Sequence, residues 1–240
     1  MVFVPISDAN PLRTIRFQWV TAALIVFNVV VFVLEHVEPG ASRAASFAMV
    51  PKELFGVQIF GGNAQGPFDT VAVPEGLTLL TYMFLHGDIF HLFSNMLFLW
   101  VFGDNVEDAM GHTKFLVFFV LCGIVGGLAH AALQPASKMP LIGASGAVAG
   151  VIGAYLLLHP RVLVWVLAFR FIPLKIPAAL VLGVWVLTQF IMVFVTQTEP
   201  EQVAWWAHLG GLATGALLIV IFRRPGVPLL DRGLQTVRAA

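Results

Sequence analysis

Ser145 and His208 are the side chains in this sequence whose types and surroundings most favour nucleophilic catalysis. Ser145 lies in the Gly-Ala-Ser-Gly stretch Gly143–Gly146, whose glycines allow close backbone approach and a helix start with free N–H groups near the serine. Such N–H groups can stabilise a developing oxyanion. A serine hydroxyl is a weak nucleophile and needs a base, for which His208 is the candidate. Taken singly, a serine packed among small residues and a satisfied buried histidine are the structural alternatives.

His91 and Asn95 form a second candidate pair, because residues four apart share one face of a helix. Both side chains can donate hydrogen bonds without bringing a permanent charge into an apolar environment. The pair is interpreted either as an interaction that holds helices together or as part of an oxyanion-binding site beside Ser145. His86, five residues before His91, is expected to point away from it by about 140° around the same helix.

The composition indicates where this chemistry would occur. Of the 240 residues, 59% are apolar and only 11% are charged, and the mean hydropathy is +0.90. These values exclude an ordinary cytosolic enzyme, a disordered chain and a disulfide-stabilised secreted module. The 13 basic and 13 acidic residues balance, so a nucleic-acid partner is not expected. Cys122 is the only cysteine and cannot form a disulfide within the chain.

Six apolar windows are long enough to cross a membrane. They are Phe17–Leu34, Met83–Phe102, Phe115–Leu133, Leu141–Leu158, Ala178–Val195 and Val203–Phe222. The predicted fold is therefore an all-α bundle of six transmembrane helices in a single domain, residues 1–240, with short tails. A seventh apolar stretch, Val162–Ile172, is about half the necessary length and is interpreted as a cytoplasmic interfacial connection.

The basic residues predict the orientation of this bundle. With six spans both termini share one side, which holds Arg13, Arg16, Lys114, Arg161, Arg170, Lys175, Arg223, Arg224, Arg232 and Arg238. The other side holds Arg43, Lys52 and Lys138. The positive-inside rule places both termini in the cytoplasm, where basic ends meet anionic lipid headgroups. A signal peptide cleaved near Ala41–Ala44 is the alternative for the first span, but that apolar run exceeds a typical signal-peptide core.

Acidic residues avoid every predicted span except for Glu35 at the outer end of the first. This distribution argues against an intramembrane aspartyl protease and against carboxylate-based ion coupling, and no H-E-x-x-H metalloprotease motif occurs. No acidic or thiolate partner lies near the histidines of the predicted spans, so no metal or other cofactor is expected. These histidines are His86, His91, His130 and His208.

His91, Ser145 and His208 are expected to lie at one depth in the membrane. Each follows the outer start of its predicted span by about four to eight residues, or ~6–12 Å at ~1.5 Å per residue. The three spans run in the same direction, so the three side chains can meet.

Two small-residue faces predict how the fourth and sixth spans pack. Gly146 and Gly150 are four residues apart, as are Gly211 and Gly215, and such faces let helix backbones approach closely. If the helices pack along these faces, the serine and the histidine come within hydrogen-bond reach.

These features together resemble the rhomboid intramembrane serine proteases, over most of the chain. The resemblance rests on the six spans, on His86 followed by His91-x-x-x-Asn95, on the G-x-S-G of Gly143–Gly146, and on the A-H-x-G-G around His208. Cytoplasmic termini and a long, partly apolar first outer loop also fit. The sequence looks like a prokaryotic member, which implies a prokaryotic plasma membrane.

The resemblance implies a role for each residue. Ser145 would be the nucleophile and His208 the base of a two-residue dyad. His91 and Asn95 would hold the oxyanion together with the backbone N–H of Ser145. The supporting positions would be Gly143, Gly146 and His86. Substrates would be transmembrane segments of other membrane proteins, cleaved in or near their outer part.

The sequence departs from the family pattern in two places. Many members carry an aromatic residue four positions after the serine, stacked on the histidine, but here that position is Ala149. Trp205 and Trp206 are the neighbouring side chains that could orient His208 instead. A Trp-Arg pair, common in the first outer loop of many members, is not found here.

Two other functions compete with proteolysis. A rhomboid-like pseudoprotease would bind membrane proteins or act as a chaperone, but such proteins lack a catalytic residue, whereas both candidates are present here. A transporter or channel would fit Gly-rich helices, yet no charged residue lines a predicted span and no halves repeat. The outer loop Thr196–Val203 is a candidate lid over the site.

Overall fold

The computed structural model describes residues 3–37, 45–56, 71, 73–168, 171–195 and 203–231 of the chain. Most of these residues are helical. The elements are β1 (Phe3–Asp8), α1 (Trp19–Val37), α3 (Pro51–Gly56), α4 (Glu75–Thr81), the 3-10 helix η1 (Tyr82–Phe84), α5 (Ile89–Met110), α6 (His112–Leu133), α7 (Ser145–Leu158), β2 (Leu163–Ala168), β3 (Ile172–Pro177), α8 (Ala178–Val195) and α9 (Trp205–Phe222).

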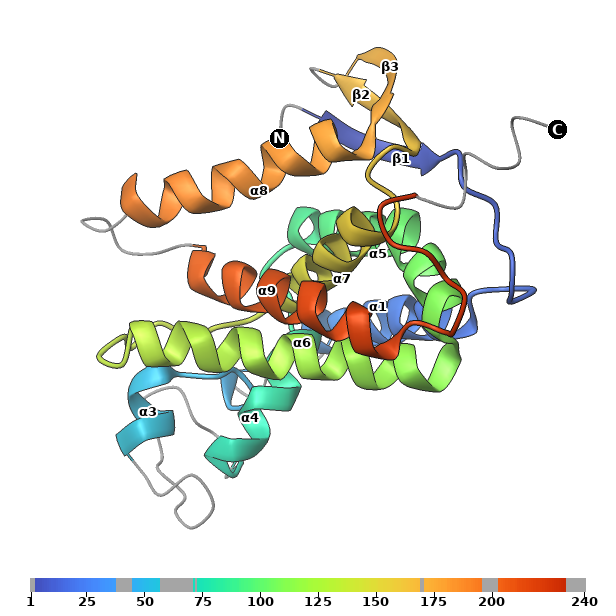
Figure 1. Cartoon of the computed structure of the whole chain (residues 1–240). Coiled ribbons are helices and arrows are strands. Elements are labelled where there is room, and N and C mark those ends of the chain that lie inside the picture. Colours follow the sequence, from blue (N-terminus) through green and yellow to red (C-terminus); the bar gives the residue numbers. More distant parts are fainter. Residues whose placement is uncertain are drawn as a thin grey trace, which may run out of the picture.

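The long helices form a bundle around α7 (Figure 1). Helices α1, α5, α6, α8 and α9 are long and apolar enough to cross a membrane, as judged over the described residues. Helix α7 has only 14 residues, but nearly all of its side chains are buried. Protein surrounds it, so the non-helical backbone before Ser145 can lie deep in the bundle without facing lipid. The chain is therefore a multi-pass membrane protein, with α7 as the shortest of the six predicted spans.

The second predicted span is wrong at both ends. Helix α5 begins at Ile89 because Asp88 caps it: the Asp88 carboxylate accepts the backbone N–H groups of Phe90 and His91, at 2.8 and 2.9 Å. The helix then continues to Met110, eight residues beyond the predicted end. Three acidic residues therefore lie within a membrane-length helix, contrary to the prediction that acids avoid the spans. They are Asp104, Glu107 and Asp108.

Glu107 explains why an acid is tolerated in α5. Its fully buried carboxylate accepts the backbone N–H groups of Val20 and Thr21, at 3.0 and 2.8 Å, in the first turn of α1. The Thr21 hydroxyl and His112 Nδ1 complete its hydrogen bonds, at 2.7 and 2.5 Å. The Asp108 carboxylate accepts three further backbone N–H groups just before α1, those of Arg13, Thr14 and Ile15. The two carboxylates thus fasten the start of α1 to the end of α5.

A three-stranded antiparallel sheet corrects the all-α prediction. Strand β2 pairs with β1 on one side and with β3 on the other. The stretch interpreted as an interfacial connection, Val162–Ile172, contains all of β2. Its side chains alternate between exposed and buried positions, the period of a half-buried strand, which the apolar composition of the stretch concealed. The Lys175 ammonium of β3 lies 5.6 Å from the centre of the Trp165 ring of β2.

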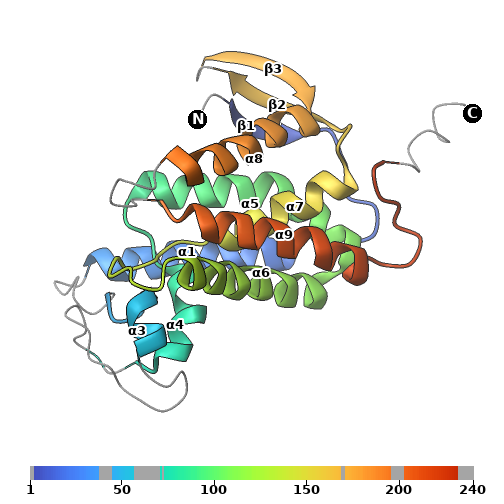
Figure 2. The ribbon, with the colours of Figure 1, turned by 60° about the vertical axis from the view of Figure 1, so that its left-hand side comes forward.

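The long outer segment is described only in part, since residues 38–44, 57–70 and 72 fall outside the described residues. The short helices α3 and α4 lie beside α6 in both ribbon views (Figure 2). The side chain of Leu54 is fully buried there, and the backbone N–H of Lys52 bonds to the carbonyl of Ser137. This part of the segment is therefore packed against protein.

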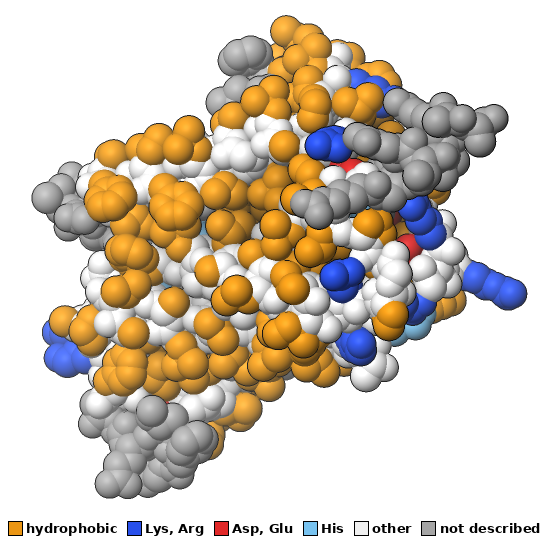
Figure 3. Space-filling model, in the orientation of Figure 1, with side chains coloured by type: hydrophobic (Ala, Val, Ile, Leu, Met, Phe, Trp, Pro, Cys, Tyr) orange, Lys and Arg blue, Asp and Glu red, His pale blue; other side chains and the backbone are white. Residues whose placement is uncertain are grey.

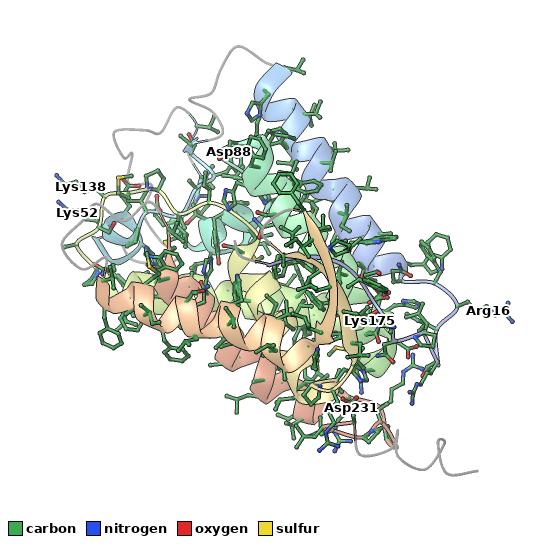
Figure 4. The ribbon with its side chains drawn as sticks, turned by 90° about the horizontal axis from the view of Figure 1, so that it is seen from above. Arg16, Lys52, Asp88, Lys138, Lys175 and Asp231 are labelled. Carbon is green, nitrogen blue, oxygen red and sulfur yellow. The ribbon has the colours of Figure 1, made fainter. Side chains whose placement is uncertain are left out.

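The surface has the charge distribution of a membrane protein. Apolar side chains cover most of the face in Figure 3, and Lys and Arg gather toward its ends. Viewed from above, Lys52 and Lys138 lie at one end and Arg16 at the other (Figure 4). The separation agrees with the predicted topology, in which these ends lie on opposite sides of the membrane. The cytoplasmic placement of the termini stays a prediction.

The Glu107 bonds predict a large loss of stability when the carboxylate is removed. Glu107→Ala leaves buried N–H groups of α1 without acceptors, which costs on the order of 3 kcal/mol. We expect a lower unfolding midpoint in detergent, measured by thermal or SDS titration. Glu107→Gln, which keeps one acceptor oxygen, is the control and should cost less. Equal losses in the two variants would contradict the role assigned to Glu107.

The partly buried Asp8 carboxyl at the end of β1 should make the stability of the fold depend on pH. Asp8 accepts a hydrogen bond from the Tyr155 hydroxyl at 2.5 Å, but burial raises the pKa of the Asp8 carboxyl above its usual 3.8. The neutral form therefore stabilises the fold at acidic pH, and this contribution is lost as the pH rises through the raised pKa. Asp8→Asn should raise the unfolding midpoint at neutral pH, with a gain that shrinks on acidification. A gain that grows on acidification would contradict this sign.

Candidate functional site

The structure brings Ser145 and His208 into contact, as the sequence predicted. The Nε2 atom of His208 lies 2.8 Å from the Oγ atom of Ser145. Ser145 is the first residue of α7, and His208 lies in the first turn of α9 with 8% of its surface exposed. An imidazole nitrogen at this distance can accept the hydroxyl proton.

Close packing of α7 and α9 produces this contact. A Cβ atom at Gly211 would collide with the backbone carbonyl of Gly146, and one at Gly215 with that of Gly150. The two small-residue faces found in the sequence therefore lie against each other, as predicted. Because both helices lack side chains there, their backbones approach closely enough for the serine and the histidine to meet.

Gly143 and His91 define the space beside the serine. Gly143 has φ = +116°, a backbone conformation that favours glycine. A Cβ atom there would also lie 2.7 Å from Cε1 and Nε2 of the His91 ring. The backbone N–H of Gly143 bonds to the carbonyl of Tyr82 at 2.9 Å, and this fixes the loop before α7. The His91 ring and Ser145 thus border the same small space.

Backbone N–H groups at the start of α7 also border this space. The first helical hydrogen bond of α7 runs from Val148 N–H to the carbonyl of Ala144, at 2.9 Å. The N–H groups of Ser145 and Gly146 precede this bond, so the helix itself provides them with no acceptor. The sequence predicted such a helix start from the glycines around Ser145.

Asn95 lies one turn after His91 on α5, on the same side of the helix. Its Nδ2 atom donates a hydrogen bond to the backbone carbonyl of His91 at 3.1 Å. The side chain is buried and borders the cavity that contains Ser145. One of its two amide N–H bonds is used locally, so the second can serve a ligand.

The orientation predicted for His86 is wrong. His86 precedes α5 instead of continuing the helix, so the angle of about 140° does not apply. Its ring lies edge-on to that of His91, with the ring centres 5.1 Å apart. His86 supports His91 by packing, and no group of three His, Cys, Asp or Glu side chains in the described part of the chain could hold a metal.

His91, Ser145 and His208 all fall within the first turn of their helices. Their common depth in the membrane stays a prediction. Each helix starts later than its apolar window, because extended or 3-10 backbone takes up the first apolar residues. The site therefore lies where three helices begin.

Gln189 of α8 is a site residue that the sequence analysis did not assign. Its Oε1 atom lies 2.7 Å from Nδ1 of His208, on the opposite side of the ring from Ser145. The rings of Trp185 and Trp205 flank the histidine, each with its centre 5.9 Å from that of His208. The sequence signal that could have identified Gln189 is a polar amide side chain within an otherwise apolar span.

These side chains share one cavity of about 1030 Å³. Residues from five helices line it, among them Asn95, His130, Ser145, Ile152, Gln189 and His208. The cavity is large enough to hold a stretch of peptide with water beside it. Its proposed lid, Thr196–Val203, lies outside the described residues except for Val203, which lines the cavity.

Comparison with known proteins identifies the family. A family model described as "Rhomboid domain" matches residues 74–225, which include every site residue discussed above. The chain belongs to the rhomboid family. This match confirms the resemblance that the motifs indicated.

Several curated rhomboids share parts of the sequence. "RHOMBOID-like protein 12, mitochondrial" of Arabidopsis thaliana is 32% identical over 157 residues, 58% of this chain and 44% of that protein. "Rhomboid protease GluP" of Bacillus subtilis is 41% identical over 86 residues, 36% of this chain and 16% of that protein. "Putative rhomboid protease YdcA" of the same bacterium is 28% identical over 159 residues, 62% of this chain and 68% of that protein. The chain thus spans less than half of the first two relatives.

The contact between α7 and α9 predicts that an added methyl group at Gly211 is destabilising. Gly211→Ala forces the two backbones apart, although alanine favours a helix over glycine by about 1 kcal/mol. We expect a clearly lower unfolding midpoint in detergent. Gly183→Ala in α8 is the matched control, because a Cβ atom there meets nothing within 4 Å, and it should be neutral or stabilising. If both variants were equally stable, close packing would not be the constraint.

Proposed function

We propose that this chain is an intramembrane serine protease that hydrolyses a peptide bond in or near the outer part of transmembrane segments, with a Ser145–His208 dyad. The observation that carries the proposal is the 2.8 Å contact between Ser145 Oγ and His208 Nε2 inside the large cavity. Membership of the rhomboid family supports it, as do the relatives whose names include the word protease.

In the first step, Ser145 Oγ attacks the substrate carbonyl carbon as His208 Nε2 takes the hydroxyl proton. The histidine then gives this proton to the leaving amine, and the peptide C–N bond breaks to leave an acyl-enzyme. A water molecule, deprotonated by the same nitrogen, hydrolyses the ester and releases the serine. The opening of the cavity at the start of three helices gives water a route to Ser145.

The negative charge of the tetrahedral intermediate falls on the substrate oxygen beside the start of α7. The backbone N–H of Ser145 and the second amide N–H of Asn95 can donate to it, and the His91 ring borders the same space. Donors that are already in place cost little reorganisation when the charge develops. The absence of a side chain at Gly143 supports this arrangement, because any side chain there would displace the His91 ring.

The depth and size of the site indicate the form of the substrate. A carbonyl in a membrane helix is held in a hydrogen bond to the residue four positions later, so a substrate helix must open before attack. Segments with Gly or Pro near their outer end open most easily and should be preferred. Phe98 and Ile152 line the cavity with apolar surface that suits such a segment.

The cellular location follows from the predicted orientation. Six spans with both termini in the cytoplasm would place the site near the outer face of a prokaryotic plasma membrane. The relatives include two Bacillus subtilis proteins and also proteins named as mitochondrial, so the family alone does not select the membrane.

The dyad predicts the loss of activity in two variants that leave the bundle folded. Ser145→Ala removes the nucleophile and His208→Ala removes the base, and each should lower the cleavage rate of a reporter transmembrane segment by more than about 10³-fold. Cleavage is measured in proteoliposomes by the appearance of the two product fragments. Ser7→Ala and His36→Ala are the matched controls, because both residues are exposed and remote from the cavity.

Two outcomes would contradict the proposal. Cleavage retained in either dyad variant would remove that residue from the mechanism. Substrate association without cleavage by the unmodified protein would instead support a non-catalytic rhomboid-like binder or chaperone.

A further inference from the structure

We infer that Gln189 is a positioning residue that fixes the tautomer of His208, so that the unprotonated Nε2 faces Ser145. The inference rests on the proposed function and adds a third side chain, from α8, to the site. Its basis is the 2.7 Å contact between Gln189 Oε1 and His208 Nδ1. Gln189 has only 3% of its surface exposed, so this contact lies within the protein.

The surroundings of Gln189 decide which end of its amide faces the histidine. Its Nε2 atom lies 2.9 Å from the backbone carbonyl of Trp185 and 3.1 Å from the hydroxyl of Thr188. A carbonyl oxygen can only accept, so the NH2 end of the amide must point toward Trp185. The oxygen end then necessarily faces His208.

The direction of this amide determines the proton on the imidazole. Gln189 Oε1 can only accept a hydrogen bond, so His208 Nδ1 must carry a hydrogen and donate it. A neutral imidazole has one N–H, which leaves Nε2 with a free lone pair 2.8 Å from Ser145 Oγ. The opposite tautomer would turn an N–H toward the serine and could not accept its proton.

Among the described residues, Gln189 is the side chain that contacts His208 Nδ1. The indole N–H groups of Trp185 and Trp205 are donors only, although both rings flank the histidine. Of the acidic side chains that the structure describes, Asp88 alone lines the cavity, and it accepts backbone N–H groups at the start of α5. Ala149, where related proteins carry an aromatic ring, has no polar atom in its side chain.

An alternative is that Gln189 merely holds α8 to α9. Helix α8 exposes many large apolar side chains and has few other polar contacts with the bundle. A purely structural role would alter stability and leave the state of the imidazole unchanged. The two roles therefore differ in the protonation of His208, which can be observed directly.

The test compares Gln189→Met, which keeps the length of the side chain without a good acceptor, with Gln189→Glu, which keeps an acceptor oxygen. We expect Gln189→Met to lower kcat by about 10- to 100-fold with little change in KM, by analogy with the loss of other orienting groups. Gln189→Glu should recover much of this loss.

A second measurement does not depend on proteolysis. Nitrogen-15 NMR of protein labelled at histidine should show His208 protonated at Nδ1 alone, and Gln189→Met should give a mixture of tautomers. Leu187→Ala, at a neighbouring side chain of α8 that is 57% exposed, is the control and should leave both the spectrum and kcat unchanged.

The outcomes separate this inference from the proposed function. If Gln189→Met keeps the kcat and the tautomer of the unmodified protein, the positioning role is wrong while the dyad stands. If Gln189→Glu is as impaired as Gln189→Met, the acceptor oxygen is not what matters, and the inference again fails. If the unmodified protein shows the Nδ1 tautomer but no Ser145-dependent cleavage, the proposed function fails and the positioning role survives.

Discussion

The close contact between two helix backbones is the constraint on which the site depends. Gly146 of α7 faces Gly211 of α9, where a Cβ atom would collide with the backbone carbonyl of Gly146. The apolar environment provides no hydrophobic drive for this contact, so it is close packing that holds the helices together. Separation of these backbones would move Ser145 Oγ away from His208 Nε2, from which it now lies 2.8 Å. The glycines are therefore part of the site even though they contribute no reactive atom.

Two buried side chains join helices by accepting hydrogen bonds from another helix. Glu107 of α5 receives the free N–H groups of α1, and Gln189 of α8 receives the N–H of His208 of α9. Such internal partners are the condition for polar groups within a membrane protein. The neutral Gln189 achieves at the site what a carboxylate would achieve only at the additional cost of burying a charge.

Much of this architecture could be predicted from the sequence. The multi-pass helical bundle, the packing faces and the meeting of Ser145 with His208 follow from apolar length and glycine spacing, which are local properties. The ends of the helices did not follow, because a cap such as Asp88 outweighs continuing hydrophobicity. Strand β2 was missed because its apolar run conceals a period of two. Gln189 was missed because its partner lies on another helix, and only the packed structure brings the two together.

The most direct test of the account is to map where a serine-directed fluorophosphonate reacts. The probe forms a stable phosphonyl ester only with an activated serine hydroxyl, and mass spectrometry of the digested protein locates the adduct. The account predicts one adduct, at Ser145, whose formation slows sharply when His208 is replaced by alanine. An adduct at another residue, or labelling of Ser145 at an unchanged rate without His208, would contradict it.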